Sequence, residues 1–485
     1  MDSLKAQGFA AFFWDFFGKI ARYGTTFIIT VFLARILEPS DFGLIAMIMV
    51  IVMIALVFTD VGLGSALIQR RRLLPVHYSS VFYFNVFVGV ILALITFFSA
   101  SWISDFYNNE QLISVTQVIA LLFVINAFSS VQTSKLRKEL NYAALAKAEV
   151  AAAVLSGVTG IGLALYGAGV WSLVAQALSR GVFYNIFVWS ASKWIPSLLF
   201  SLKALMQLWG FGFRIFLSSL LEIVYSKLDV LIIGKLFTPA ILGFFDQAKR
   251  LDLMITELSS GSILAVIFPV LSKVQNDLSR FQNIVIKTLS IISFLIFFLL
   301  GVMYLISEEL IVLLFTEKWL PSVIYFKILI LSGFAYPISV LLVNVLTSRG
   351  NSKTFFRLEI YKKILQSINL YIGFLWGVEG YLYGLVIVAI LSVSLNILFA
   401  SREIKLSFFV FLKPIIVQMA ISFIVVWLVI IFTEEIEIYG ILMLVMKSII
   451  FTVLYFIINK LLKTSSYGSF EEQLSQILKR RKGVE

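Results

Sequence analysis

The sequence contains no cysteine, a single histidine and few charged residues. Only 14% of its 485 residues are charged, whereas a soluble globular protein carries about 25%. Without cysteine there are no disulfides, thiolate metal sites or cysteine nucleophiles, and one histidine does not make a histidine metal site. His77 stands in a basic segment, where we expect a solvated loop residue. The sequence therefore predicts neither a metal nor a cofactor.

Apolar residues dominate what is present. They make up 60% of the chain, and the mean hydropathy is +0.99. Runs of roughly 20 apolar residues, the length that crosses a bilayer, recur along the chain, and none alternates with a period of two. The N-terminus shows no cleavage pattern, so we expect the first helix to be retained. The predicted fold class is an all-α integral membrane protein.

We predict fourteen transmembrane helices. Their approximate ranges are 17–37, 43–68, 79–100, 112–132, 144–165, 168–190, 208–234, 240–270, 284–306, 322–347, 355–376, 380–400, 411–432 and 439–461.

Basic residues are distributed by topology. The even-numbered connections and the C-terminal tail hold 22 lysines and arginines when Lys147, Lys413 and Lys460 at the adjoining span ends are counted. The odd-numbered connections hold two, Lys235 and Lys318. The positive-inside rule then places both termini in the cytoplasm, and a bacterial inner membrane is the expected location. A net charge of +12 suggests nucleic acid only when it gathers on one soluble face, so we expect no nucleic-acid partner.

A faint internal repeat predicts two related halves. RILEPSDFGL at 35–44 resembles KLFTPAILGF at 235–244, and LYGAGVWSLV at 165–174 resembles LWGVEGYLYGLV at 375–386. Such halves are related about an axis along the membrane normal, with the substrate site between them. The predicted organisation is an N-lobe (1–192), an amphipathic cytoplasmic linker (193–207), a C-lobe (208–402), two extra helices (403–463) and a basic amphipathic tail (464–485) that is either bound to anionic lipid or solvated.

The eighth predicted span is unusually charged, since it carries Asp246, Lys249, Arg250, Asp252 and Glu257. At the bilayer centre these charges would cost roughly 12 to 17 kcal/mol, against a gain of about 6 to 12 kcal/mol from its apolar residues. This helix cannot face lipid all round. It must line water or pair with its neighbours.

Two further helices carry polar stripes. Arg214, Ser218, Glu222, Tyr225 and Asp229 follow helical spacing on the seventh span. The first span has a similar stripe through Lys19 and Arg22, and Arg180 lies near the middle of the sixth. Either these charges frame a polar cavity or they form internal ion pairs, such as Arg214 with Glu222. The candidate substrate-binding residues are Lys19, Arg22, Arg180, Arg214, Lys249 and Arg250.

Acidic residues inside the spans are candidates for ion coupling. A buried carboxylate takes up a proton or binds sodium. Asp60, in FTDVGLGSAL, equally well caps a helix break before Gly62 and Gly64, and the sequence leaves these two interpretations open. The candidate coupling and cavity carboxylates are Asp60, Glu222, Asp229, Asp246, Asp252 and Glu257.

Several segments together resemble a known family. FLARILEPSDFGLIAM, TDVGLGSALIQRR, SKLRKELNYAALAKAE, GAGVWSLVAQALSR and EKWLPSVIYFKILILSGFAYPISVLLVNVLTSRG are similar, in order and spacing, to the Wzx-type polysaccharide flippases of the multidrug, oligosaccharidyl-lipid and polysaccharide exporter superfamily. The likeness covers residues 1 to about 460. It implies two six-helix lobes around a cavity, with two further helices.

The resemblance also implies a function. Such proteins move an undecaprenyl-diphosphate-linked oligosaccharide outward for surface glycan assembly, and cavity arginines are thought to receive the diphosphate. Arg22 and Arg250 are the candidates in this chain. The expected partners are this lipid-linked glycan and membrane lipids, with contacts to other polysaccharide-assembly proteins left open. The expected energy source is an ion gradient or the membrane potential.

Three other functions compete with this interpretation. A multidrug exporter of the same superfamily binds cations, which favour an acidic cavity rather than the basic one predicted here. A membrane glycan polymerase or ligase is expected to have a large external loop, which the sequence does not contain. An ATP-driven pump needs a GxxxxGK[ST] phosphate-binding loop, and the sequence has none. We therefore expect a transporter and not an enzyme.

Overall fold

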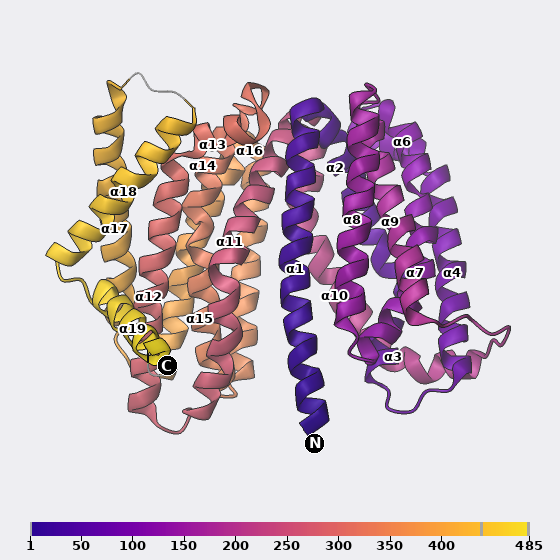
Figure 1. Ribbon diagram of the computed structural model, residues 1–485, viewed down its shortest axis with the longest axis horizontal. Helices are drawn as coiled ribbons and strands as arrows, with labels where there is room; N and C mark the ends of the chain where they lie inside the picture. Colours follow the sequence, from indigo (N-terminus) through magenta and orange to yellow (C-terminus); the bar gives the residue numbers. More distant parts are fainter. Residues whose placement is uncertain (1, 437–439, 483–485) are drawn as a thin grey trace. The chain divides into compact units, whose positions relative to one another are not determined.

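The computed structural model describes residues 2–436 and 440–482, and the side chains of these except 2–10, 12, 255–266, 374 and 477–482. Every regular element in the described residues is a helix, which confirms the predicted fold class (Figure 1). The helices are α1 (Asp2–Ile36), α2 (Pro39–Asp60), α3 (Leu63–Gln69), α4 (Pro75–Phe98), α5 (Ala100–Tyr107), α6 (Gln111–Ile119), α7 (Leu121–Lys138), α8 (Tyr142–Leu165), α9 (Val170–Ser192), α10 (Leu202–Leu236), α11 (Pro239–Lys273), α12 (Leu278–Leu305), α13 (Ser307–Phe315), the 3₁₀ helix η1 (Glu317–Trp319), α14 (Ser322–Gly333), α15 (Ala335–Ser348), α16 (Ser352–Glu403), α17 (Phe408–Glu434), α18 (Ile441–Leu461) and α19 (Ser465–Lys482).

Ten helical segments within the described residues are long and apolar enough to cross a membrane. The chain is therefore a multi-pass membrane protein. Four predicted spans are not among the ten, namely α9, α10, α11 and the part of α16 before its kink at Gly377. These four contain many of the charges that the sequence analysis selected. The count of fourteen spans stays a prediction.

The helices repeat in the same order along the chain. α1 and α10 both have 35 residues, and α2 and α11 begin at Pro39 and Pro239. Positive φ values at Leu140 and Gly350 end two equivalent turns. The asparagine that follows each turn, at 141 and 351, accepts a backbone N–H bond from three residues on. This agreement of turns and caps extends the repeat seen in the sequence.

The two equivalent proline-led helix starts contact one another. A Cβ added at Gly43 would lie 1.7 Å from the carbonyl oxygen of Pro239, and one added at Gly243 would lie 2.0 Å from that of Pro39. Only glycine permits such an approach between backbones. The contact is reciprocal, because each glycine packs against the proline of the other helix.

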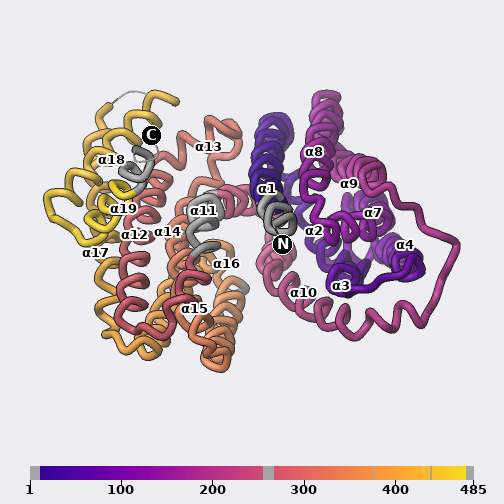
Figure 2. Tube along the Cα trace, turned by 60° about the horizontal axis from the view of Figure 1, so that its bottom comes forward, coloured from indigo at the N-terminus to yellow at the C-terminus, as the bar shows by residue number. Residues whose placement is uncertain are grey.

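The chain divides into two compact units, Met1–Asp246 and Gln247–Glu485. In the first unit α8 packs between α1 and α9, and α10 packs on α2 and α3. Figure 2 shows α10 within this unit and the segment after α9 running around its outside. The predicted lobe boundaries at 192 and 208 stay a prediction.

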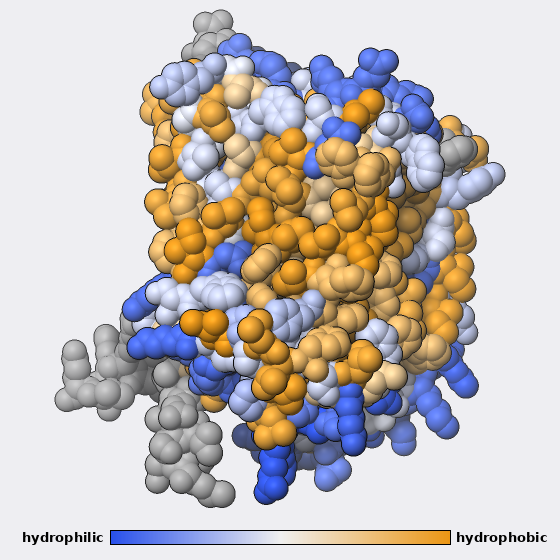
Figure 3. All heavy atoms as spheres, turned by 90° about the vertical axis from the view of Figure 1, so that its right-hand side faces the viewer, coloured by the Kyte–Doolittle hydropathy of each residue, from blue (hydrophilic) through white to orange (hydrophobic). Residues whose placement is uncertain are grey.

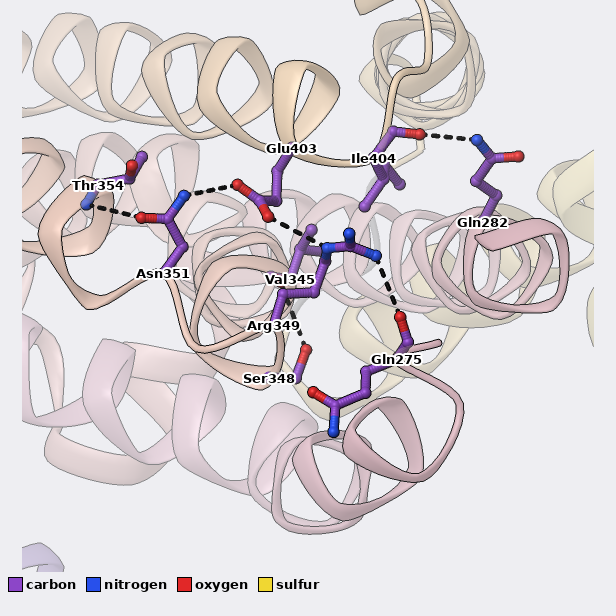
Figure 4. A network of polar contacts seen from close by, with 9 residues as sticks. All are labelled: Gln275, Gln282, Val345, Ser348, Arg349, Asn351, Thr354, Glu403 and Ile404. Carbon is purple, nitrogen blue, oxygen red and sulfur yellow. Dashed lines mark hydrogen bonds and ion pairs between the residues drawn. The ribbon is translucent and has the colours of Figure 1, made fainter. Parts of the chain in front are cut away.

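In the second unit three connections are joined by a polar network (Figure 4). Arg349 Nε lies 3.1 Å from Glu403 Oε1, and Arg349 Nη1 donates to the carbonyl of Gln275 at 3.2 Å. Asn351 Nδ2 donates to the other oxygen of Glu403 at 2.7 Å. The network ties the α15–α16 turn to the end of α16 and to the α11–α12 connection.

The first unit has an equivalent arrangement at the end of α7. Lys138 Nζ donates to the carbonyl of Leu67 at 2.7 Å and also to that of Arg70. Lys135 Nζ donates to the carbonyl of Ser192, at the end of α9, at 2.9 Å. In the first unit two lysines near the end of α7 therefore tie it to the ends of α3 and α9, much as Arg349 and Asn351 join three connections in the second unit.

The tail helix α19 packs within the second unit. Tyr467 and Phe470 pack on Phe294 of α12, with ring centroids 5.9 and 5.0 Å away, and Lys287 Nζ lies 2.7 Å from Glu472 Oε2. Neither a solvated tail nor a wholly lipid-bound one describes this contact. Tyr467 and Phe470 find an aromatic cluster that the local sequence does not reveal.

Candidate functional site

A charged cluster in the first unit joins three helices. Arg22 of α1 has its Nε 3.2 Å from Glu149 Oε2 of α8, and the two side chains are 30% and 28% exposed. Arg180, on α9, lies close enough for the charges of both to act on it. We call Arg22, Glu149 and Arg180 the arginine cluster. It brings together two guanidinium groups and one carboxylate.

The helices position these groups through their packing. α1 and α9 lie on either side of α8, and small residues on α8 allow close approach. A Cβ on Gly157 would lie 2.4 Å from Ile29 of α1, and one on Gly160 would lie 3.0 Å from Gln176 of α9. Glycines at these two positions therefore let both arginine-bearing helices approach the helix that carries Glu149.

The hydrogen bonding of the arginine cluster is incomplete within the described residues. Arg22 Nε is buried and has no partner with hydrogen-bond geometry despite its short distance to Glu149. The guanidinium carbon of Arg22 lies 4.8 Å from the Tyr23 ring centroid. No hydrogen bond or ion pair is made by Arg180 among the parts of the chain that the structure describes. The cluster thus keeps guanidinium donors for an anion.

A tyrosine completes this region. Tyr184 follows Arg180 by one helical turn, and its hydroxyl lies 3.1 Å from Thr133 Oγ1 of α7. The charges of Glu149 and Arg22 act on it as well. Neither Glu149 nor Tyr184 was predicted from the sequence as a site residue. The available signals were Glu149 near the start of a largely apolar helix and the four-residue step from Arg180 to Tyr184.

The remaining basic candidates are placed differently. Lys19 pairs with Asp15 at 2.6 Å on its own helix. Arg214 Nε donates to the carbonyl of Gly210 at 3.0 Å, one turn back along α10. Lys249 is partly exposed and Arg250 is exposed, both on α11 in the second unit. Of the six basic candidates, the structure brings Arg22 and Arg180 together.

Asp60 caps a helix break, as one of its two interpretations predicted. Both of its carboxylate oxygens accept the Gly64 N–H at 3.0 Å, and Oδ1 also accepts from Asn85 at 3.1 Å and from Ser130 at 2.9 Å. The break itself lies at Val61 and Gly62, whose φ angles are 46° and 71°. A role for Asp60 in ion coupling stays a prediction.

The other carboxylates show varied surroundings. Glu222 is exposed, and within the described side chains no ion pair joins it to Arg214. Asp229 is 8% exposed, and its Oδ1 accepts the Val230 N–H at 2.8 Å. Asp246 is partly buried, and one oxygen of Asp252 is buried without a hydrogen-bond partner among the described residues. The side chain of Glu257 lies outside the described residues.

His77 is not a solvated loop residue, so that prediction was wrong. It lies in the first turn of α4 and is 5% exposed. Its Nδ1 accepts the Leu74 N–H at 3.1 Å, and its Nε2 lies 3.2 Å from Gln207 Oε1. Gln207, on α10, covers it, and the local sequence gives no sign of a partner 130 residues away.

Residues 32–324 match the family model described as polysaccharide biosynthesis protein. The chain is 25% identical over 434 residues to an uncharacterized membrane protein in the cps region of Klebsiella pneumoniae, covering 87% of this chain and 86% of that one. It is 24% identical over 422 residues to the lipopolysaccharide biosynthesis protein WzxC of Escherichia coli K12, covering 85% and 82%.

The fold resembles a solved structure, that of the lipid II flippase MurJ in an inward closed conformation. The TM-score is 0.70 at 16% identity, and the match covers 94% of this chain and all of that one. At this identity the likeness concerns the fold.

Proposed function

The chain belongs to the polysaccharide biosynthesis protein family, and we propose that it is a flippase for undecaprenyl-diphosphate-linked oligosaccharide. In this proposal it moves repeat units from the cytoplasmic to the outer leaflet of a bacterial inner membrane by alternating access, and catalyses no reaction. The name of its relative WzxC and the fold it shares with the lipid II flippase MurJ support this function. Its likeness to Wzx-type flippases supplies the carrier lipid.

The arginine cluster is the observation on which the proposal rests. Two guanidinium groups near a single carboxylate leave one positive charge unbalanced. A diphosphate is a multiply charged anion, and planar guanidinium groups bind phosphate oxygens through two hydrogen bonds each. Arg22 and Arg180 are therefore suited to receive the diphosphate from two neighbouring helices.

Glu149 gives this receptor a means of release. While Arg22 contacts Glu149, its charge is partly balanced and its desolvation cost is reduced. An entering diphosphate competes with the carboxylate for Arg22, and the carboxylate competes again when the diphosphate leaves. We expect this exchange to keep binding reversible, which a transporter needs and a pure receptor does not.

The decisive experiment measures binding of the lipid-linked precursor together with protein level. Arg22→Ala and Arg180→Ala should each weaken binding by roughly tenfold to a hundredfold, because each removes a charge-assisted contact of about 1.5 to 3 kcal/mol. Lysine at either position should restore binding only in part, since it lacks the planar fork. Arg280→Ala, at an exposed arginine in the first turn of α12, is the matched control.

A structural role would give a different pattern. If Arg22 served only to neutralise Glu149, Arg22→Ala would lower the amount of folded protein, Glu149→Gln would rescue it, and precursor binding per molecule would stay at the wild-type level. Wild-type binding by both alanine variants would refute the proposed site. Under the proposal, Glu149→Gln alone should bind the precursor more tightly and release it more slowly.

The candidate residues outside the arginine cluster belong to the proposal as well. We propose that Arg250, in the second unit, provides a second diphosphate contact, so that Arg250→Ala also abolishes export while the protein accumulates normally. Lys19, Arg214 and Lys249 would line the path of the anion. Glu222, Asp229, Asp246, Asp252 and Glu257 remain candidates for carrying the coupling ion, proton or sodium.

The proposed orientation is tested with reporter fusions. Fusions at Asn108, Glu309 and Glu435 should report the outside, and fusions at Arg71, Lys138 and Arg349 the cytoplasm. A reproducible inversion between neighbouring fusions would remove a span and reverse the assignment of every later connection.

A further inference from the structure

The segment that joins α9 to α10 turns its apolar side chains outward. It begins after Ser192, where α9 ends, and continues into the first turns of α10, which starts at Leu202. Leu198 is 96% exposed and Ile195 78%. We call residues 193–206 the linker arm. Its exposed apolar residues are Ile195, Leu198, Leu199, Phe200, Leu202 and Met206.

The linker arm is held in place through its backbone and one aromatic ring. The N–H of Ser197 donates to Ser79 Oγ at 3.0 Å, and the N–H of Ser201 donates to Ser80 Oγ at 2.8 Å. Both acceptor serines, in the first turns of α4, are fully buried. Trp194 packs on Tyr78, with ring centroids 6.0 Å apart. The polar backbone therefore faces the protein while the apolar side chains face outward.

The two stretches of sequence that form and adjoin the linker arm carry charge of one sign, and the nearby Glu139 is paired with Lys135. Arg71 and Arg72 follow α3, and Lys193 and Lys203 belong to the arm itself; all four side chains are exposed. Positions 61–80 and 190–210 contain no aspartate or glutamate. Figure 3 views the first unit from the side of α4. Apolar residues cover the middle of this face, and some of them continue downward among hydrophilic residues at its lower end.

We propose that the linker arm inserts into the cytoplasmic leaflet and binds anionic phospholipid. Its leucines and phenylalanine would enter the boundary between head groups and acyl chains, where interfacial segments bury apolar residues. The four basic residues would meet the phosphates of the head groups, because cationic segments beside a membrane are attracted to anionic lipid. The lack of any acidic residue in both stretches favours lipid over a protein partner of mixed charge.

The geometry explains why the arm needs this lipid. An apolar patch exposed to water favours aggregation. The membrane–water interface buries the same side chains without a partner protein. Because Ser79 and Ser80 fix the arm to α4, lipid contact would anchor the cytoplasmic end of the first unit at a set depth. The inference needs only the proposed orientation and does not depend on which substrate is carried.

Because the chain has no cysteine of its own, a spin label attached to a single introduced cysteine reports the membrane depth of that position alone. A spin label on Leu198→Cys would be compared with one on Asn276→Cys, an exposed position between α11 and α12, and one on Phe423→Cys, exposed on the apolar helix α17. In bilayers of phosphatidylglycerol, the Leu198 label should collide with oxygen as the Phe423 label does. It should be shielded from a water-soluble nickel chelate that reaches the Asn276 label.

Two results would overturn the proposal. Nickel access at Leu198 equal to that at Asn276 would place the linker arm in water. Shielding from both oxygen and nickel would mean that protein covers it. Both measurements are independent of transport, so a failure here leaves the proposed function standing.

The anionic preference has its own test. The relative association of spin-labelled phosphatidylglycerol over phosphatidylcholine should fall by up to about fivefold for each basic residue replaced by glutamine at Arg71, Arg72, Lys193 and Lys203. Matched replacements at Lys273 and Lys353, which are exposed at the end of α11 and the start of α16 in the second unit, should leave the preference at the linker arm unchanged. An unchanged preference in the fourfold variant would refute the head-group contact.

Discussion

Alanine at Gly43 should open the reciprocal contact between α2 and α11. The added methyl would lie 1.7 Å from the carbonyl oxygen of Pro239, so the two helix starts must separate by about 2 Å to reach ordinary contact. Such overpacking costs about 1 to 3 kcal/mol. The proposed orientation puts this contact at the outer end, and we expect it to break when the transporter opens outward. The cost would then fall mainly on the outward-closed state.

The expected result is a shift of the conformational equilibrium. A penalty of about 1 to 3 kcal/mol on one state changes its ratio to the other by about 5-fold to 150-fold. Gly243→Ala should act similarly, since its methyl would lie 2.0 Å from the carbonyl oxygen of Pro39. The free-energy shift in the double variant should be smaller than the sum of the two single-variant shifts, because the separation of the helices caused by one methyl also relieves the clash of the other.

The assay uses the cysteine-free chain. A single cysteine at Ser40, in the first turn of α2, should react faster with a membrane-impermeant maleimide applied from outside when Gly43 or Gly243 is alanine. Gly24→Ala is the matched control, since nothing lies within 4 Å of its added Cβ. Labelling rates equal to those of the control, in protein of normal thermal stability, would refute the argument that this contact closes the outer end.

Three further outcomes follow from particular contacts. Asp60→Asn should keep much of the cap on Gly64 while removing the charge. Normal folding with a changed ion dependence of transport would assign ion coupling to Asp60. An unchanged ion dependence of transport would leave Asp60 with the role of a cap alone. For the Arg349–Glu403 pair, a double-mutant cycle of thermal stability should give a coupling energy of about 0.5 to 3 kcal/mol, whereas additive losses would show that the pair contributes nothing of its own. Hydrogen bonds from the Arg280 N–H and the Ser279 hydroxyl lower the pKa of Asp277 below its ordinary 3.8. A lowered pKa stabilises the fold above pH 3.8, and this stabilisation is lost as the pH falls through the pKa of the folded state. The stability advantage of wild type over Asp277→Leu should therefore shrink in acid, and a constant advantage would contradict the cap.

Sequence patterns predicted the helices and the faces that carry charge. Apolar length, basic asymmetry and the two proline-led repeats each depend on local composition, and this is what a single sequence records well. Arg22 and Arg180 were both selected because a charge inside an apolar helix needs a partner or water. Their grouping around Glu149 depends on the rotation and packing of three helices, which helical periodicity does not specify.

Long-range partners account for what the sequence did not predict. His77 looks solvated beside three arginines, yet Gln207 covers it from a helix far along the chain. The tail has an amphipathic pattern suited to lipid, but Phe294 and Lys287 of α12 offer it an aromatic and an ionic contact. In both cases the nearby residues were compatible with more than one environment, and tertiary packing chose between them.

The four charged helices also bear on how the chain enters the membrane during synthesis. α9 and α10 have too many charges or too little hydropathy to count among the helices that cross by composition alone, so insertion one helix at a time would stall at them. By the time α9 emerges, α7 and α8 are already made, and α10 finds α2, α3 and α4, against all of which it packs. We therefore expect the earlier helices to assist the insertion of α9 and α10 by packing against them. A mutation on α2 or α8 that weakens this packing should reduce the insertion of a helix that the ribosome has not yet produced.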